Sequence, residues 1–237
     1  MNVIQHPIVF FLLGIPVRDT VVYTWITMAI IVGIVFLLKV LKPDLLEMIL
    51  EMIIGVVDDA MDVDNLHPYI PLLGSLMVFV LVSNLISMLP VIKSPTADIN
   101  TTIALALIVI FSVHIYGMQK KGVWSYLKQF ASPILLFPIE LIGQVSRTLS
   151  LSMRLFGNVL SGDMIVAIVF SIIPAFLPVA MIALGMITGV LQAYVITTLA
   201  ALFISSAVEI NEEDLRIKDE KAARKNLKKI RKELANG

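Results

Sequence analysis

Long apolar runs separated by short polar segments predict a chain that is folded from membrane-spanning helices. A helix needs about 20 consecutive apolar residues to cross the hydrocarbon core of a bilayer. Three runs in the first half of the sequence are long enough and carry few or no charges: 20–40, 67–92 and 99–119. We expect each of these runs to cross the membrane once.

The second half of the sequence contains an apolar stretch that is too long for one crossing. It covers residues 133–208 and is interrupted by Pro174 and Pro178, which are expected to end or kink a helix. Two long helices are therefore predicted over 133–172 and 178–208, folded as a hairpin. Because each is longer than a perpendicular crossing requires, strong tilt or partial burial in the membrane plane is expected. The predicted fold is an all-α polytopic membrane protein with about five crossing helices.

Two segments outside these runs carry most of the charges. Residues 44–62 form a predicted amphipathic helix, in which the acidic residues share one face and apolar residues make up the rest. We expect this helix to lie on the membrane surface, with its acidic face toward water or a protein partner. Residues 209–237 form a predicted charged helix with oppositely charged pairs four residues apart. That pattern is typical of a solvated helix, and docking to a partner is the alternative.

The composition indicates which environment the chain is adapted to. Of the 237 residues, 58% are hydrophobic and 15% are charged, the mean hydropathy is +0.94, and 18 basic residues balance 18 acidic ones. So low a charge content indicates a lipid bilayer as the main solvent and excludes a disordered chain. The zero net charge argues against nucleic-acid binding, and the absence of cysteine excludes a disulfide-stapled secreted module.

Residue types that would support catalysis or cofactor binding are not grouped in this sequence. It contains no cluster of metal-ligating residues, no glycine-rich phosphate-binding loop and no nucleophile motif. We therefore expect no metal, no cofactor and no catalysis by this chain on its own.

Basic residues are shared unequally between the two ends of the predicted spans. Lysines follow the first and third spans, and further basic residues occur in the tail, whereas Arg18 and Lys93 are the basic residues of the alternate side. By the positive-inside rule, the N-terminus is expected outside the cell and the tail, 209–237, in the cytoplasm. Residues 1–208 are expected to form a single transmembrane domain.

A stripe of polar residues runs along the helix predicted over 133–172. Viewed down the helix axis, most of them fall within about 40° of the direction of Arg154, and Gln144 lies about 80° from it. The stripe is about 32 Å long at 1.5 Å per residue, which matches the thickness of a bilayer core. Random polar insertions would scatter around the helix, whereas these residues form a continuous polar track along one face. Its members are Glu140, Gln144, Arg147, Ser150, Arg154, Asn158 and Ser161.

Arg154 is the most costly residue of this stripe. An arginine in the middle of a bilayer costs about 3 to 10 kcal/mol or more, and it cannot avoid this cost by losing its proton. Asp163 points about 180° away on the same helix, and Glu140 lies about 21 Å away along the axis. Residues 164–208 contain no acidic residue. We infer that Arg154 meets either a carboxylate of another subunit or an aqueous path.

The helix predicted over 178–208 has features that complement Arg154. Gly185 and Gly189 form a small-xxx-small pattern, which lets two helix backbones approach closely. Packing is the default interpretation of these glycines. Gln192 lies one turn from Thr188 and is a candidate to hydrogen-bond near Arg154.

Residues 149–158, LSLSMRLFGN, closely resemble the signature of subunit a in the membrane (Fo) sector of F-type ATP synthases. The resemblance extends over most of the chain, because segments 83–90, 95–107 and 191–194 also match the family pattern. Such a combination is more specific than any single short motif.

The resemblance implies a stator channel that adjoins a rotating ring of c subunits and couples the flow of protons or Na⁺ to ATP synthesis. It implies that Arg154 meets the ring carboxylate and that Glu140 lies in a cytoplasmic half-channel. Asn158, Asp163 and Gln192 match positions of the opposite half-channel. The two long helices would form their hairpin beside the ring. The peripheral-stalk b subunits and the rest of the synthase are further implied partners, in the inner membrane of a bacterial cell or, alternatively, in a thylakoid.

Several positions depart from the family pattern, among them Ser87, which stands where some relatives have an acid, and the basic tail after Glu209. Gly185 stands where some bacterial members carry a histidine, as in the chloroplast and cyanobacterial type, and Asp163 stands where the family often has glutamate. Asp163 is therefore expected to serve the outer half-channel without a histidine partner.

The alternative class of protein is a self-contained, ion-coupled secondary transporter, which would favour internal repeats and polar groups on several helices. The residues themselves leave the choice between protons and Na⁺ open.

Overall fold

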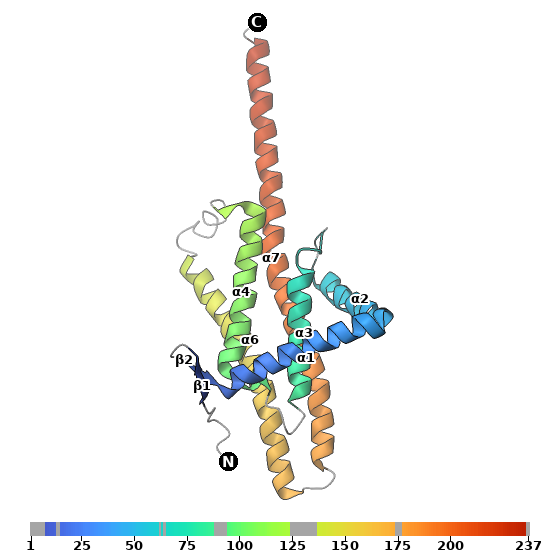
Figure 1. Cartoon of the computed structure of the whole chain (residues 1–237). Coiled ribbons are helices and arrows are strands. Elements are labelled where there is room, and N and C mark those ends of the chain that lie inside the picture. The colour runs from blue at the N-terminus through green and yellow to red at the C-terminus, as the bar shows by residue number, and fades with distance from the viewer. Residues whose placement is uncertain are drawn as a thin grey trace.

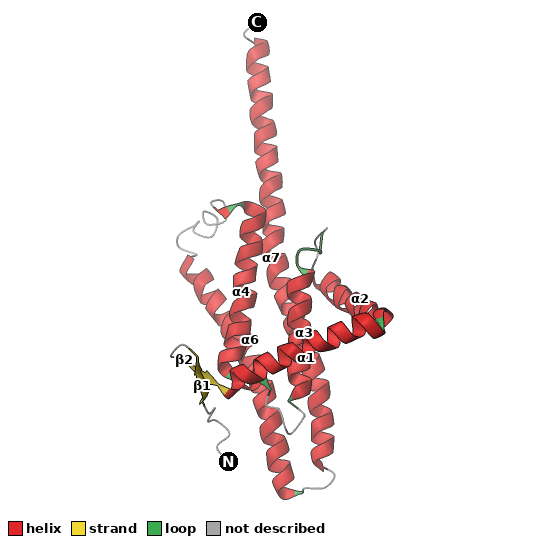
Figure 2. Ribbon diagram, viewed as in Figure 1, coloured by secondary structure: helices red, strands yellow, loops and turns green. Residues whose placement is uncertain are grey.

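The computed structural model describes residues 8–12, 15–61, 63, 65–87, 94–123, 137–173 and 177–235. Within these ranges nearly every residue lies in a helix (Figures 1 and 2). The elements are β1 (Ile8–Leu12), β2 (Ile15–Arg18), α1 (Asp19–Leu41), α2 (Pro43–Ala60), α3 (Ile70–Ile86), the 3₁₀ helix η1 (Pro95–Ala97), α4 (Ile99–Lys121), α6 (Phe137–Ile172) and α7 (Leu177–Ala235). The two short strands precede α1 in the chain and pair antiparallel with each other. The sequence pattern did not predict them.

Helices α3, α4, α6 and α7 pack together as a bundle (Figure 1). Apolar side chains from all of them meet at its centre and are almost completely buried: Leu73, Val109, Leu155 and Ile196. In a bilayer the tails of the lipids are as apolar as these side chains, so packing and hydrogen bonds rather than the hydrophobic effect must hold the helices together.

The predicted all-α polytopic membrane fold is confirmed. Helices long and apolar enough to cross a bilayer cover Asp19–Leu41, Ile99–Lys120, Ile142–Ile172 and Leu177–Val208. The helix predicted over 67–92 is shorter than expected, because α3 begins at Ile70 and ends at Ile86. Its 17 residues are at the lower limit for a crossing. Residues 88–92 of that prediction lie outside the described residues, as do residues 133–136 of the helix predicted over 133–172.

The first apolar helix takes a course that its sequence did not reveal. Figure 1 shows α1 crossing α3 at a steep angle instead of lying alongside the long helices. It contacts α3, α2 and η1, and most of its surface is exposed. A helix that is apolar all round has no preferred buried face, so its sequence pattern fixes its length but not its direction.

Helix α2 corresponds to the amphipathic helix predicted over 44–62. It begins at Pro43, a position where the missing N–H of proline costs nothing, and it packs against α7. Ile53, Val57 and Ala60 are buried on this side. The acidic residues are exposed: Asp44, Glu47, Glu51, Asp58 and Asp59; Asp62 lies outside the described residues. The location of this helix on a membrane surface remains a prediction.

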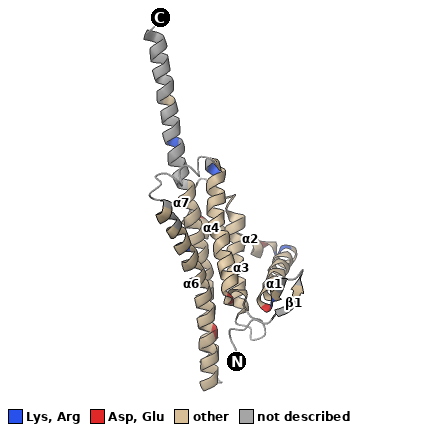
Figure 3. Ribbon diagram, turned by 90° about the vertical axis from the view of Figure 1, so that its left-hand side faces the viewer, with Lys and Arg blue, Asp and Glu red and all other residues tan. Residues whose placement is uncertain are grey.

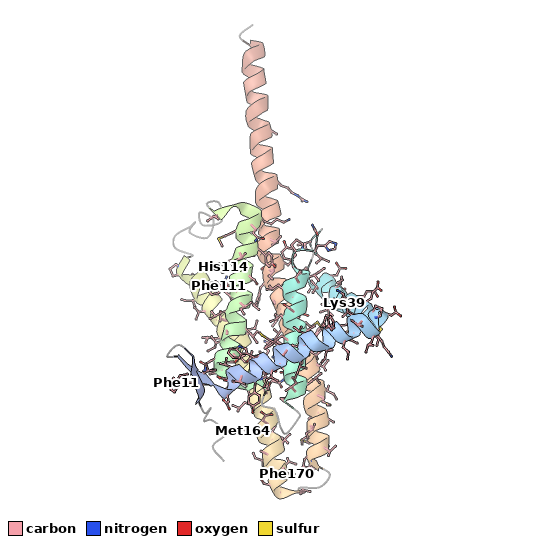
Figure 4. The ribbon with its side chains drawn as sticks, viewed as in Figure 1. Phe11, Lys39, Phe111, His114, Met164 and Phe170 are labelled. Carbon is pink, nitrogen blue, oxygen red and sulfur yellow. The ribbon has the colours of Figure 1, made fainter. Side chains whose placement is uncertain are left out.

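Helix α7 does not end where the apolar sequence ends. It continues without a break from Leu177 to Ala235, so the predicted charged tail is the second half of the same helix (Figure 1). At the opposite end of the molecule, α6 and α7 extend beyond α3 and α4 as a hairpin. Apolar side chains there, among them Met164 and Phe170, are exposed (Figure 4). Such a surface requires lipid or another protein as its neighbour.

A short polar segment, Ser94 to Asp98, joins the helices near the start of α4, and we call it the strap. Ser94 Oγ donates to the Ser83 carbonyl at 2.9 Å, and Thr96 Oγ1 donates to Asn84 Oδ1 at 3.3 Å. Asn84 Nδ2 in turn donates to the Gly189 carbonyl of α7 at 3.1 Å. These side chains are buried, so each bond satisfies a polar group that water cannot reach.

We predict that Gly189→Val destabilises the bundle, because a Cβ atom at this position would lie 3.0 Å from the Cβ of Asn84. Overpacking of this kind costs about 1–3 kcal/mol in the free energy of unfolding. The measurement is thermal unfolding of the purified protein in detergent. The control is Gly33→Val on exposed α1, where nothing lies within 4 Å of an added Cβ. Equal unfolding midpoints for the two variants would contradict this account of the α3–α7 contact.

Candidate functional site

Arg154 lies on the side of α6 that faces away from the bundle core. Its neighbours Leu151, Ser152 and Leu155 are buried, whereas the Arg154 side chain is exposed. Among the described residues, none forms an ion pair or a hydrogen bond with the Arg154 guanidinium. Charged residues are rare over the whole bundle, as Figure 3 shows. The chain therefore presents a permanent cation at its apolar surface.

The other residues of the predicted polar stripe share this side of α6. Arg147, Ser150 and Ser161 are exposed, and Gln144 and Asn158 are half-buried. Glu140 belongs to the first turns of the same helix, and its side chain lies outside the described residues. The stripe is thus open to a neighbouring molecule along most of its length.

Arg147 differs from Arg154 because it has a partner inside the chain. Its guanidinium carbon lies 5.1 Å from the ring centroid of Phe203 on α7. A cation over an aromatic face is attracted by the negative charge of the ring's π electrons, and the attraction strengthens where water is excluded. This contact ties α6 to α7 at the end of the stripe nearer the tail.

Asp163 lies further along α6, in the part of the hairpin that extends beyond the core. Its side chain is exposed, and its position in the helix is half a turn away from that of Arg154. The two charges therefore project from different sides of the helix, and no ion pair joins them.

Gln192 on α7 is buried, with 8% of its surface exposed, and its Nε2 atom has no hydrogen-bond partner within the described part of the chain. The hydrogen bond that we considered between Gln192 and Arg154 is not formed. Gly189, one turn earlier, lies against Asn84 of α3. Gly185 is half-buried, and its carbonyl accepts a hydrogen bond from Thr188 Oγ1 at 3.0 Å. A buried, unpaired amide N–H₂ costs free energy unless water or a ligand completes it.

Contacts between helices are the part of this site that sequence reasoning missed. Ser152, two residues before Arg154, lies 3.2 Å from Thr102 of α4, measured between their hydroxyl oxygens. Both residues belong to segments that resemble the family pattern, which was the available signal. The spacing of residues along one helix predicts which of them share a face, but it does not identify their partners on other helices.

The arrangement suits the binding of a carboxylate. Within the described ranges there is no group of three or more histidine, cysteine, aspartate or glutamate residues that could hold a metal ion. Within the described part of the chain, the site offers the unpaired guanidinium of Arg154 on an apolar surface, flanked by hydroxyl and amide groups. A carboxylate presented by a neighbouring molecule would complete it.

Comparisons with known proteins identify the pattern. A family model described as ATP synthase A chain matches residues 21–205. ATP synthase subunit a 2 of Acaryochloris marina is 40% identical over 213 residues, which cover 85% of this chain and 90% of that protein. ATP synthase subunit a of Geobacter sulfurreducens is 38% identical over 81% of this chain and 88% of its own length. ATP synthase subunit a of Nitrosospira multiformis is 36% identical over 93% and 92%, respectively.

The Arg147–Phe203 contact predicts a measurable coupling between the two side chains. In a double-mutant cycle of Arg147→Met and Phe203→Leu, we expect an interaction free energy of about 0.5–2 kcal/mol in thermal unfolding. The matched control replaces Phe203→Leu by Phe111→Leu, since Phe111 is an exposed phenylalanine of α4. Additive effects in the Arg147–Phe203 cycle, like those expected in the control cycle, would show that the ring does not hold the guanidinium.

Proposed function

The chain belongs to the ATP synthase A chain family, and from that premise we propose that it is the stator channel through which protons or Na⁺ pass beside the rotating c-ring. Members of this family are multi-pass membrane subunits of the synthase. In this proposal the chain supplies two half-channels, and the ring carries the ion between them. The flow of ions then drives rotation and ATP synthesis.

The exposed, unpaired Arg154 is the observation that carries the proposal. A guanidinium on an apolar surface stabilises the ionised form of any carboxylate that approaches it. A ring carboxylate that reaches Arg154 therefore gives up its ion, and it binds a new one after it has passed. The same positive charge repels ions that would otherwise move directly from one half-channel to the other. The membrane potential supplies about 2.3 kcal/mol per charge for each 100 mV.

The two half-channels are proposed to reach Arg154 from opposite ends of the α6–α7 hairpin. Glu140 would serve the cytoplasmic half-channel, and Gln144, Arg147, Ser150 and Ser161 would line the stripe that continues from it. Asn158, Asp163 and Gln192 would serve the outer half-channel. The projection of Asp163 from a different side of α6 than Arg154 supports two separate paths. The unpaired Nε2 of buried Gln192 supports a water-filled space beside it.

The distribution of basic residues supports the proposed orientation. The N-terminus would lie outside and the end of α7 in the cytoplasm of a bacterial cell, where it is on the side of the catalytic part of the synthase. The peripheral-stalk b subunits are the proposed stator partners. A self-contained secondary transporter, the alternative class, is set aside because the family match covers most of the chain.

We predict that Arg154→Ala abolishes ATP-driven ion pumping in inverted membrane vesicles while the synthase still assembles. The physical reason is that the ring carboxylate no longer meets a cation that favours its ionised form. Pumping is followed with a pH-sensitive dye, with and without Na⁺, and assembly by co-purification of the c subunit. Arg18→Ala is the control, because Arg18 is an exposed arginine outside the stripe. Normal coupled pumping by the Arg154→Ala synthase would refute the proposal.

We predict that Asp163→Asn slows coupled pumping at least about tenfold, because an amide cannot exchange ions with the outer half-channel. Asp163→Glu keeps the carboxylate and is expected to restore most of the rate. The measurement is the initial rate of ATP-driven pumping at equal amounts of assembled synthase. An unchanged rate in Asp163→Asn would remove Asp163 from the proposed path.

A further inference from the structure

The placement of Arg154 depends on the backbone of α6, because its side chain has no partner in the described chain. Resting on the function proposed above, we propose that the hydrogen-bonded pair Ser152–Thr102 is a positioning device that sets the register of α6 against α4. Through this register the pair holds Arg154 at a fixed place opposite the ring. Neither residue contacts the ion or the ring in this proposal.

The pair is buried and lies within hydrogen-bond distance. Ser152 is 1% exposed and Thr102 is 0% exposed. The Thr102 hydroxyl lies 3.0 Å from the Ile99 carbonyl and donates its one hydrogen there. The Ser152 hydroxyl lies 3.2 Å from Thr102 Oγ1, so Ser152 can donate to Thr102 while Thr102 donates to Ile99.

Apolar contacts at the same level fix the face of α6 but not its register. Leu151 and Leu155 are buried beside Ser152. Apolar side chains tolerate a shift along the helix axis at modest cost, because any similar surface can replace the lost contacts. A shift by one turn would take the buried Ser152 hydroxyl away from Thr102, which is costly, whereas Thr102 would keep its bond to the Ile99 carbonyl. The polar pair is thus the feature that selects one register.

The α4 side of the pair is anchored to the rest of the bundle. Thr102 lies in the first turn of α4, whose N-terminus is capped by Asp98, which accepts from the Asn100 N–H at 2.9 Å. Asp98 Oδ2 also accepts from Thr20 Oγ1 of α1 at 2.8 Å. Because Asp98 ends the strap, a force on Arg154 passes through Ser152 to α4, α1 and the strap.

A moving partner makes this anchoring important. A ring that turns past Arg154 pulls its charge sideways in every step. Misplacing a reacting group by 1 Å can cost about a hundredfold in rate. We therefore expect that weakening the pair reduces the number of ions pumped per ATP hydrolysed, whereas a purely structural role would reduce only the amount of assembled synthase.

The test compares Thr102→Val, Ser152→Ala and the double variant in inverted vesicles. Each single variant is expected to lower the ratio of ions pumped to ATP hydrolysed about three- to tenfold, with the amount of assembled synthase unchanged. The double variant is expected to be no worse than the single ones, because both remove the same bond. The matched control is Ser112→Ala, since Ser112 is a buried serine of α4 whose hydroxyl, among the described residues, bonds to the Val109 carbonyl of its own helix. Unchanged ratios, or additive losses in the double variant, would overturn the inference.

A cysteine pair tests the fixed register directly. The native chain has no cysteine, so Thr102→Cys with Ser152→Cys introduces the only thiols of this subunit. Sulfur atoms in place of hydroxyl oxygens 3.2 Å apart are close enough to form a disulfide after a small adjustment. We expect the disulfide to form and the oxidised synthase to remain coupled. Failure to form it, or loss of pumping on oxidation with recovery on reduction, would show that α4 and α6 do not keep this register.

The outcome also separates this inference from the function on which it rests. If Arg154→Ala abolishes pumping while the Thr102 and Ser152 variants pump normally, the positioning role is wrong and the channel function stands. If Arg154→Ala pumps normally, the channel function itself is wrong.

Discussion

A guanidinium cannot lose its proton, and hydrocarbon cannot solvate it, so Arg154 is tolerable only next to a negative charge or water. Within the described part of this chain, no acidic side chain pairs with it. The backbone around Arg154 is held in place by the buried side chains of Leu151, Ser152 and Leu155. Under the function proposed above, the site is completed only by a partner that supplies a carboxylate. That requirement explains why the polar stripe is left open.

Polar contacts do in this bundle what apolar contacts do in a soluble core. Lipid tails compete equally for apolar surfaces, so specific hydrogen bonds between helices decide which surfaces meet. Several such hydrogen bonds meet at the strap, which is joined to α1 through Thr20, to α3 through Asn84 and to α4 through Asp98. Asn84 then reaches the Gly189 carbonyl, and this is possible because glycine allows the close approach of α3 and α7. The architecture thus depends on few polar residues at defined positions.

Sequence periodicity predicted most helices, because a charge-free run of sufficient length has one stable form in lipid. The sequence also identified Arg154, because placing an unpaired arginine in a bilayer costs free energy whatever the arrangement of the helices. The course of α1, the short length of α3 and the unbroken length of α7 were not predictable in this way. Neither were Arg147–Phe203 and Thr102–Ser152, because these pairs join residues far apart in the sequence. Their formation depends on the relative positions of whole helices, which no local pattern specifies.

The unbroken course of α7 has a mechanical consequence. Its 59 residues form a rod about 88 Å long, and after Pro178 it contains no proline that could act as a hinge. Gln192 and Phe203 belong to the same rod as the charged end at Ala235. A force that bends the charged end therefore also acts on the part of α7 inside the apolar bundle. Conversely, a displacement of α7 beside Gln192 also moves its charged end. The helix is therefore a strut, which gives a stationary subunit the stiffness to resist torque.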